Sequence, residues 1–160
     1  MKPYLGGMKH ILVGLMLLLP PIAAFAAPSP DGLWLTQDHD GIIGISPCDG
    51  KLCARIDGLI LDHADDRTPV DYRGVSQCHL PLITDAEQVE ANLWRGHITN
   101  PRNGSVYHVE LHLETGGALA LRGYIGIPLL GQTQTWTRYD GKVPEDCRMT
   151  KPEGGDVVSR

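Results

Sequence analysis

From residue 33 to residue 138 the chain is a succession of short segments that alternate apolar and polar residues. Residues 92–99 and 105–113 are typical, and the turn-forming residues Pro101-Arg-Asn-Gly104 separate them. Such alternation places the apolar side chains on one face of a strand, and no long amphipathic helix is visible. About eight short strands with little helix predict an all-β fold, a single small antiparallel β-barrel closed from a meander.

Residues 1–26 have the pattern of a secretory signal peptide. They contain two lysines, no acidic residue and an apolar run from Ile11, and they end in Ala24-Phe-Ala26, an A-x-A cleavage site. An uncleaved membrane anchor is the alternative, although Pro20-Pro21 would interrupt its helix. Met8 is an alternative start. We therefore expect a periplasmic or secreted protein with no membrane span after cleavage.

The chain that remains after cleavage is small and acidic. It has 134 residues, with 12 basic and 19 acidic side chains and a net charge of −7. This length fits one domain, expected at 27–147 and followed by a flexible C-terminal tail at 148–160. The acidity argues against nucleic acid and anionic membranes as partners. No pattern identifies a protein partner.

All four cysteines follow the leader, where an oxidising compartment favours disulfides. Of the three possible pairings, the spacing favours Cys48 with Cys53 and Cys78 with Cys147. A zinc site is the alternative, but Cys78 and Cys147 lack neighbouring ligands at the usual spacing.

A direct bridge between Cys48 and Cys53 predicts the register of a hairpin. Residues 49–52 would form its loop, with residue 48 facing 53 and residue 45 facing 56. The bridge would then lie on the outer face. The inner face would carry Ile43, Ile45, Ala54 and Ile56.

Two segments between the strands are less regular. Residues 62–79 are polar and long for a connection, which suggests a lid or an edge loop. Their aspartates do not follow the spacing of a calcium-binding loop, so we expect solvated charges. Residues 85–91 are expected to form one helical turn or a bend.

The hairpin of residues 92–113 gathers polar side chains on one face. With Asn100 opposite Ser105, His97 faces His108 at a separation of about 5 Å. Two imidazoles so placed are able to hold zinc or copper. The simpler interpretation is an outer polar face with a cross-strand ion pair of Arg95 and Glu110. We expect no metal and no cofactor.

Aromatic side chains on the inner faces are candidates for ligand walls or for packing. An eight-stranded barrel either fills with side chains or holds one small ligand, and the chain after the leader has only seven aromatic residues and no phenylalanine. Arg122 and Tyr124 share a strand face that either lines a pocket rim or covers the outside. The candidate ligand-binding residues are Trp34, Trp94, Tyr107, Arg122 and Tyr124.

Several stretches resemble a known family. Residues 119–138, LALRGYIGIPLLGQTQTWTR, are similar to the C-terminal signature of the bacterial exported family called domain of unknown function 2147 (DUF2147). Residues 94–107 resemble its preceding hairpin, G-x-I-x-x-P-x-x-G-x-x-Y. The similarity extends to residues 31–36 and 48–56. In the 62–79 loop the family pattern D-x-x-N-P-D remains as Asp66-Arg-Thr-Pro-Val-Asp71, without the asparagine.

The resemblance implies a lipocalin-like barrel in the bacterial envelope, with no reaction established for the family. Gly32-Leu-Trp34 resembles the G-x-W of lipocalin first strands, and Arg138 stands where that superfamily sets an arginine over the tryptophan. A guanidinium on an indole face contributes roughly 0.5 to 2 kcal/mol. The residues expected to close the barrel base are Gly32, Trp34, Trp136 and Arg138.

The sequence contains no catalytic signature. The cysteines are expected to be bridged, no G-x-S-x-G motif occurs, and the acids cluster in loops or on outer faces. We therefore predict no catalytic residue and no enzyme. The leading hypothesis is a periplasmic lipocalin-like module that binds a small, largely apolar ligand. One alternative is an envelope interaction or stress adaptor with a filled barrel, and another is a metal-binding or hydrolytic protein that uses the His97/His108 face.

Overall fold

The computed structural model describes residues 29–151, so the expected signal peptide at 1–26 lies outside the described residues. Within this range no helix is long and apolar enough to cross a membrane. The elements, in chain order, are β1 (Gly32–Leu35), β2 (Gly41–Cys48), β3 (Lys51–Leu61), β4 (Pro81–Glu90), β5 (Leu93–Thr99), β6 (Val106–Leu113), β7 (Leu119–Tyr124), the 3₁₀ turn η1 (Pro128–Leu130), β8 (Gln132–Arg138) and β9 (Arg148–Thr150).

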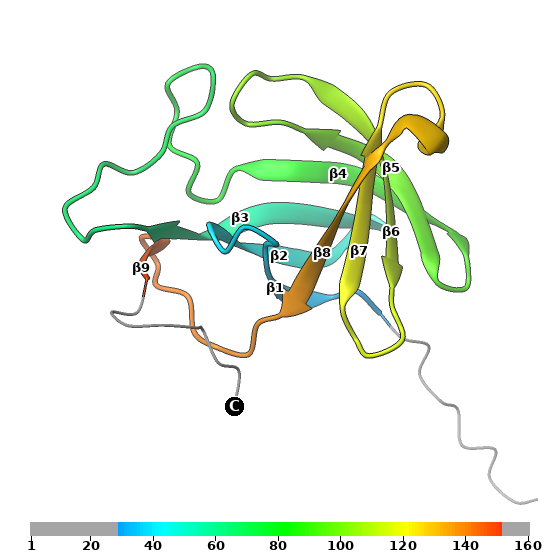
Figure 1. Ribbon diagram of the computed structural model, residues 1–160, viewed down its shortest axis with the longest axis horizontal. Coiled ribbons are helices and arrows are strands. Elements are labelled where there is room, and N and C mark those ends of the chain that lie inside the picture. Colours follow the sequence, from blue (N-terminus) through cyan, green and yellow to red (C-terminus); the bar gives the residue numbers. More distant parts are fainter. Residues whose placement is uncertain (1–28, 152–160) are drawn as a thin grey trace, which may run out of the picture.

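Strands β1 to β8 form a closed antiparallel barrel in which each strand pairs with its neighbours in sequence (Figure 1). The barrel closes where β8 pairs with β1, with Trp34 opposite Arg138 and Leu35 opposite Thr137. Closure leaves none of these eight strands with a free edge. The predicted all-β barrel of about eight strands with little helix is therefore confirmed.

The turn between β2 and β3 is shorter than predicted. Cys48 pairs with Lys51, so only Asp49 and Gly50 form the loop, with φ angles of 47° and 77°. Two consecutive positive φ angles are typical of a type I′ turn, whose twist matches that of the strands it joins. The predicted loop at 49–52 was wrong.

The inner face of this hairpin is nevertheless the predicted one. The observed pairing differs from the expected pairing by two residues, and a shift of two keeps every side chain on its face of the sheet. The inward residues are Ile43, Ile45, Ala54 and Ile56, all buried. Cys48 and Cys53 are not directly opposite but form the expected disulfide across the strands, with a Cα–Cα distance of 5.8 Å.

The β5–β6 hairpin has the predicted register. Trp94 pairs with Leu111 and His97 with His108, and Asn100 donates its backbone N–H to the Ser105 carbonyl. Residues 85–91, expected to form a helical turn or bend, mostly continue β4 instead. Burial explains the difference, because Ala86 points into the core and is 1% exposed.

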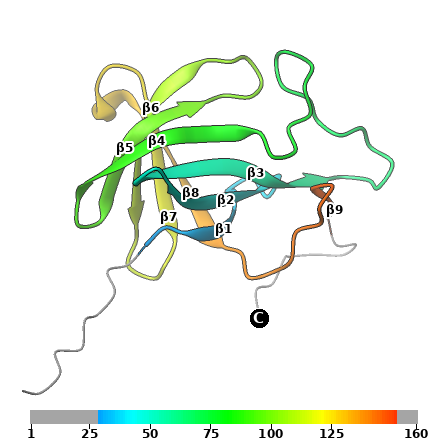
Figure 2. The same cartoon turned by 180° about the vertical axis from the view of Figure 1, so that it is seen from behind.

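The domain extends past the expected boundary at residue 147. Residues 148–150, assigned to a flexible tail, form β9, which runs parallel to the end of β3 (Figure 2). The expected disulfide between Cys78 and Cys147 ties this segment to the β3–β4 connection. Arg148 donates hydrogen bonds to Thr68 Oγ1 and to the carbonyls of Ala64 and Asp66. The rest of the tail, from residue 152, lies outside the described residues.

The loop at 62–79 is organised around a buried carboxylate rather than around solvated charges alone. The Asp71 side chain is 1% exposed. It accepts hydrogen bonds from the backbone N–H groups of Arg73 and Val75 and from the Arg73 guanidinium. Tyr72 donates its N–H to the Pro101 carbonyl, 2.8 Å away. These bonds fix the loop beside the β5–β6 turn.

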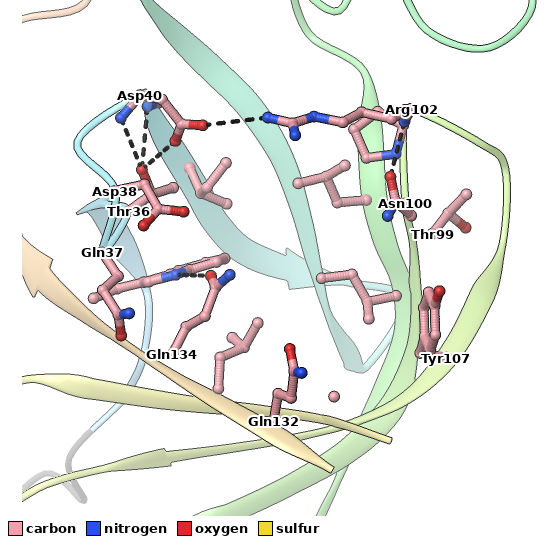
Figure 3. A pocket seen from close by; sticks show the side chains of 18 of the residues that line it. Thr36, Gln37, Asp38, Asp40, Thr99, Asn100, Arg102, Tyr107, Gln132 and Gln134 are labelled. Carbon is pink, nitrogen blue, oxygen red and sulfur yellow. Dashed lines mark hydrogen bonds and ion pairs between the residues drawn. The ribbon is translucent and has the colours of Figure 1, made fainter. Parts of the chain in front are cut away.

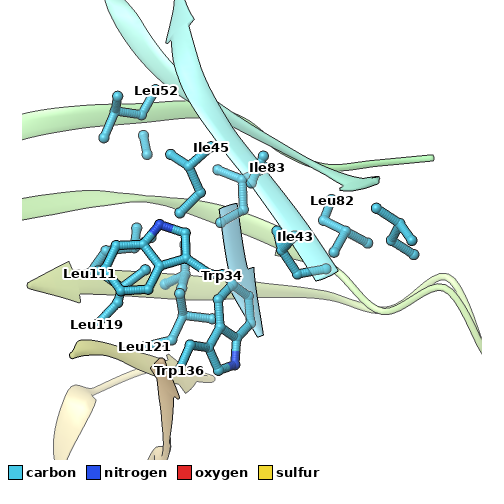
Figure 4. Packing of buried hydrophobic residues seen from close by; sticks show 14 of the residues in the cluster. Trp34, Ile43, Ile45, Leu52, Leu82, Ile83, Leu111, Leu119, Leu121 and Trp136 are labelled. Atoms are coloured by element: carbon cyan, nitrogen blue, oxygen red, sulfur yellow. The ribbon is translucent and has the colours of Figure 1, made fainter. Parts of the chain in front are cut away.

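The apolar core fills the end of the barrel where β1 begins and continues along β3 to Leu59, Leu61 and Cys147. Figure 4 shows the Trp34 and Trp136 rings among branched aliphatic side chains from β2, β4, β6 and β7. Trp34 is fully buried, Trp94 is 6% exposed, and Leu111 and Leu119 are at most 1% exposed. This end of the barrel, the base, is packed with side chains.

Candidate ligand-binding cavity

The opposite end of the barrel is hollow. A cavity of about 1110 Å³ opens there, bordered by the β1–β2 turn, the β5–β6 turn, the end of β7 and the start of β8 (Figure 3). It forms where the inward positions of β7 and β8 change from Leu121 and Trp136 to Gly123, Gln134 and Gln132. The floor is formed by Ile43, Ile56, Leu59, Leu82, Ile98, Leu121 and Trp136.

The rim of the cavity carries neutral polar side chains. In β8, Gln132 and Gln134 share the inward parity of Trp136 and border the cavity. Gln134 Oε1 accepts the indole N–H of Trp136 at 2.9 Å, and Gln37 Oε1 accepts the Thr135 backbone N–H at 3.0 Å. The remaining neutral polar residues of the lining are Thr36, Gln77, Thr99, Asn100 and Thr133.

Three charged side chains border the mouth. The Arg102 guanidinium lies 3.9 Å from Asp40 Oδ2, and Asp40 Oδ1 accepts the Thr36 hydroxyl at 2.7 Å. Asp38 is the third charged residue. The lining therefore combines two carboxylates with one guanidinium that faces one of them.

The structure separates the five candidate ligand-binding residues. Tyr107 and Tyr124 border the cavity. Trp34 and Trp94 belong to the packed core, and Trp94 also borders a smaller recess of about 310 Å³ at the base. Arg122 is not part of the lining. Its guanidinium instead donates to the carbonyls of Pro128 and Leu129 and to Thr133 Oγ1.

Arg122 thereby holds an apolar lip beside the mouth. In the segment it anchors, Ile125, Ile127, Leu129 and Leu130 are 70%, 54%, 81% and 75% exposed. Ile125 and Leu130 also border the cavity. An apolar molecule that enters the barrel would thus meet apolar side chains before it reaches the floor.

Sequence reasoning missed the glutamines and one glycine of the cavity. Gln132 and Gln134 alternate with outward residues up to Trp136. Polar residues at these inward positions were the sequence signal for a polar cavity rim. Gly123 pairs with the fully buried Val109 and with Gln132. A Cβ atom added to Gly123 would meet no heavy atom within 4 Å. This glycine leaves space that a larger residue would fill.

The His97/His108 face lies on the outside of the barrel, as the register predicted. The two rings are 4.9 Å apart between centroids, and His108 stacks on Tyr124 at 5.3 Å. The expected ion pair of Arg95 and Glu110 is present at 2.8 Å. Sequence reasoning missed Asp85, whose Oδ2 lies 2.6 Å from His97 Nδ1. Partial burial opposes ionisation of Asp85, but hydrogen bonds from the His97 side chain and backbone N–H outweigh it and lower the Asp85 pKa.

Metal-ligating atoms gather at a different place. Within residues 29–151, three such atoms lie within 4.8 Å of one another only at Cys78, His79 and Cys147. Both of these sulfurs are consumed in the disulfide, so they are not thiolate ligands. No group of this kind in the described part of the chain contains both His97 and His108.

Comparisons with known proteins bear on the family and the fold. The family model described as "Uncharacterized protein conserved in bacteria (DUF2147)" matches residues 32–138. The chain is also similar to the solved structure of protein HP1028 from the human pathogen Helicobacter pylori, which is described as belonging to the lipocalin family. The identity is 21% and the TM-score 0.58, over 69% of this chain and 82% of that one. No curated protein sequence matches the chain.

Proposed function

Because this chain belongs to the DUF2147 family and folds as a lipocalin-like barrel, we propose that it is a binding protein for a small, largely apolar molecule. It acts in the periplasm or after secretion, once its leader is removed, and it carries no catalytic activity. Its ligand occupies the hollow end of the barrel.

The cavity is the observation that carries this proposal. Its volume of about 1110 Å³ is slightly above the usual range for pockets that bury drug-sized ligands. Its apolar floor fits a site that buries an apolar molecule, and the polar groups of its rim are available to orient that molecule. The open mouth and the apolar lip at Ile125 and Leu130 give a path inward.

The two alternative functions have less support. A filled-barrel adaptor requires side chains throughout the interior, whereas here a cavity of about 1110 Å³ remains beside the packed core. A metal-dependent hydrolase on the outer face requires more ligands than His97 and His108 provide. The Asp85 carboxylate engages His97 but no nucleophilic side chain.

Native mass spectrometry tests the proposal directly. The protein is purified from its bacterial compartment without detergent and measured before and after denaturation in organic solvent. We expect a discrete added mass that denaturation releases. A bare polypeptide in repeated preparations, together with no binding of the neutral apolar dye N-phenylnaphthylamine, would overturn the proposal.

A further inference from the structure

We infer, on the basis of the proposed function, that the ligand is a single-chain amphiphile with an uncharged head. The head accepts hydrogen bonds through ester, amide or hydroxyl oxygens, and the apolar chain lies on the floor of the cavity. The orientation of three rim amides and the charges at the mouth support this inference.

The rim amides are fixed with their NH₂ groups available. The partners of Gln37, Gln134 and Asn100 are the Thr135 backbone N–H, the Trp136 indole N–H and the Arg102 backbone N–H. Each partner can only donate, so each amide must turn its oxygen toward it. The NH₂ group of each amide, with two donors, is left for a ligand, beside one further lone pair on the oxygen. Three such groups around one mouth suit a head that carries acceptor oxygens.

The charges at the mouth disfavour an anionic head. Asp38 and Asp40 are the acids of the lining and Arg102 is its one basic residue among those described. The two acids outnumber Arg102, which lies 3.9 Å from Asp40, so a carboxylate or phosphate head would meet excess negative charge. Losing water without a counter-charge is costly for an ion.

A cationic head is disfavoured by the same amides. Nitrogen-bound hydrogens carry partial positive charge, so the available NH₂ groups of Gln37 and Gln134 would repel an ammonium group. Asp40 is engaged by Arg102 and Thr36, so Asp38 is the lining carboxylate, among the described residues, that would attract an ammonium group. A neutral head with acceptor oxygens is the one class that both the amides and the carboxylates tolerate.

The floor accepts the chain of the amphiphile. Below the amides the lining is aliphatic apart from Trp136 and Tyr107, and Figure 3 shows the Tyr107 ring on the opposite side of the cavity from Gln37 and Gln134. Each methylene that leaves water for this floor adds to the affinity. Chain burial therefore provides affinity, and the rim decides which head is accepted.

Titration calorimetry with three lauryl amphiphiles tests the inference. Monolauroylglycerol is neutral, laurate is anionic and dodecyltrimethylammonium is cationic, and each is used below its micelle concentration at neutral pH. We expect monolauroylglycerol to bind at least about tenfold more tightly than either ion. Equal or tighter binding of laurate or of the ammonium would overturn the inference and leave the proposed function standing. No binding of any of the three would count against the proposed function itself.

Isosteric variants locate the head. Gln134→Glu keeps an oxygen for the Trp136 indole N–H but replaces the NH₂ group with an acceptor, and Gln37→Glu does the same beside Thr135. We expect each to weaken monolauroylglycerol binding by about tenfold. Thr137→Glu adds the same charge at an exposed position of β8 near the base and should leave binding unchanged. Unchanged binding in both glutamine variants, with thermal midpoints equal to wild type, would show that the head does not lie at these amides.

Discussion

The guanidinium carbon of Arg138 lies 4.0 Å from the centre of the Trp34 indole ring. Arg138 also donates a hydrogen bond to the Asp31 carbonyl, while the Trp34 indole N–H donates to the Pro30 carbonyl at 2.8 Å. A side chain from the last barrel strand and one from the first thus hold the segment before β1 across the base. These contacts lie outside the lining of the cavity.

Arg138→Met should lower the free energy of unfolding by about 1–2 kcal/mol, because the methionine keeps much of the packing but loses the charge over the indole. Arg138→Lys should lose less, since an ammonium retains the cation–π attraction but not the planar stacking. Urea denaturation followed by tryptophan fluorescence measures both. Equal stability of wild type and Arg138→Met would show that the contact is energetically neutral.

Gly32→Ala should destabilise the protein through Arg138. Gly32 has a φ of +123°, and an added Cβ would lie 2.5 Å from Arg138 Nη1. The substitution therefore strains the backbone and displaces the guanidinium. In an Arg138→Ala background only the backbone strain remains, so the same change should cost less. Additive effects in this double-mutant cycle would contradict the predicted coupling.

The two disulfides should differ in their contribution to stability. Cys78 and Cys147 are 69 residues apart, and Cys48 and Cys53 are 5 apart. On the loop-entropy model these bridges contribute about 4 and about 2 kcal/mol. Replacing the long bridge with a pair of serines should therefore lower the thermal midpoint more than the same change at the short bridge. The reverse order, measured by calorimetry, would contradict this.

Asp71→Asn should destabilise the β3–β4 connection in a pH-dependent way. Burial raises the Asp71 pKa, but hydrogen bonds from the Val75 N–H and from Arg73 outweigh it, so that the pKa falls below its ordinary value. A lowered folded-state pKa stabilises the protein above the unfolded value of about 3.9, and this contribution is lost as the pH falls through the folded value. Thermal midpoints of the two proteins should differ at neutral pH and converge below about pH 4. A constant difference would contradict the assignment.

The parts of the fold that depend on alternation were predictable, and those that depend on turn geometry were not. The β5–β6 register follows from one tight turn between two clear strands. The β2–β3 register was missed because a bridge between Cys48 and Cys53 fits both a direct and a diagonal pairing. β9 was missed because three residues carry no periodic signal, and their position depends on the bridge at Cys147 and on pairing with β3.

The candidate site was predictable only in part. Tyr107 follows from the inward parity of the β5–β6 hairpin. Tyr124 has the opposite, outward parity. It therefore lies at the rim, and its ring stacks on His108. Trp34 and Trp94 also point inward, but parity does not distinguish the packed base from the hollow end. The cavity is lined by segments far apart in the sequence, and their spacing is set only when the barrel closes.

Filling the cavity through Gly123 tests the central claim most directly. Gly123→Phe adds a ring where a Cβ meets no neighbour, whereas Thr137→Phe adds the same ring at an exposed position of β8 outside the cavity lining. Titration with N-phenylnaphthylamine, followed by dye fluorescence, compares both with wild type after circular dichroism has verified their folds. We predict that Gly123→Phe weakens binding by at least about tenfold and that Thr137→Phe leaves it unchanged. Equal affinity of wild type and a folded Gly123→Phe variant would contradict a binding site inside the barrel.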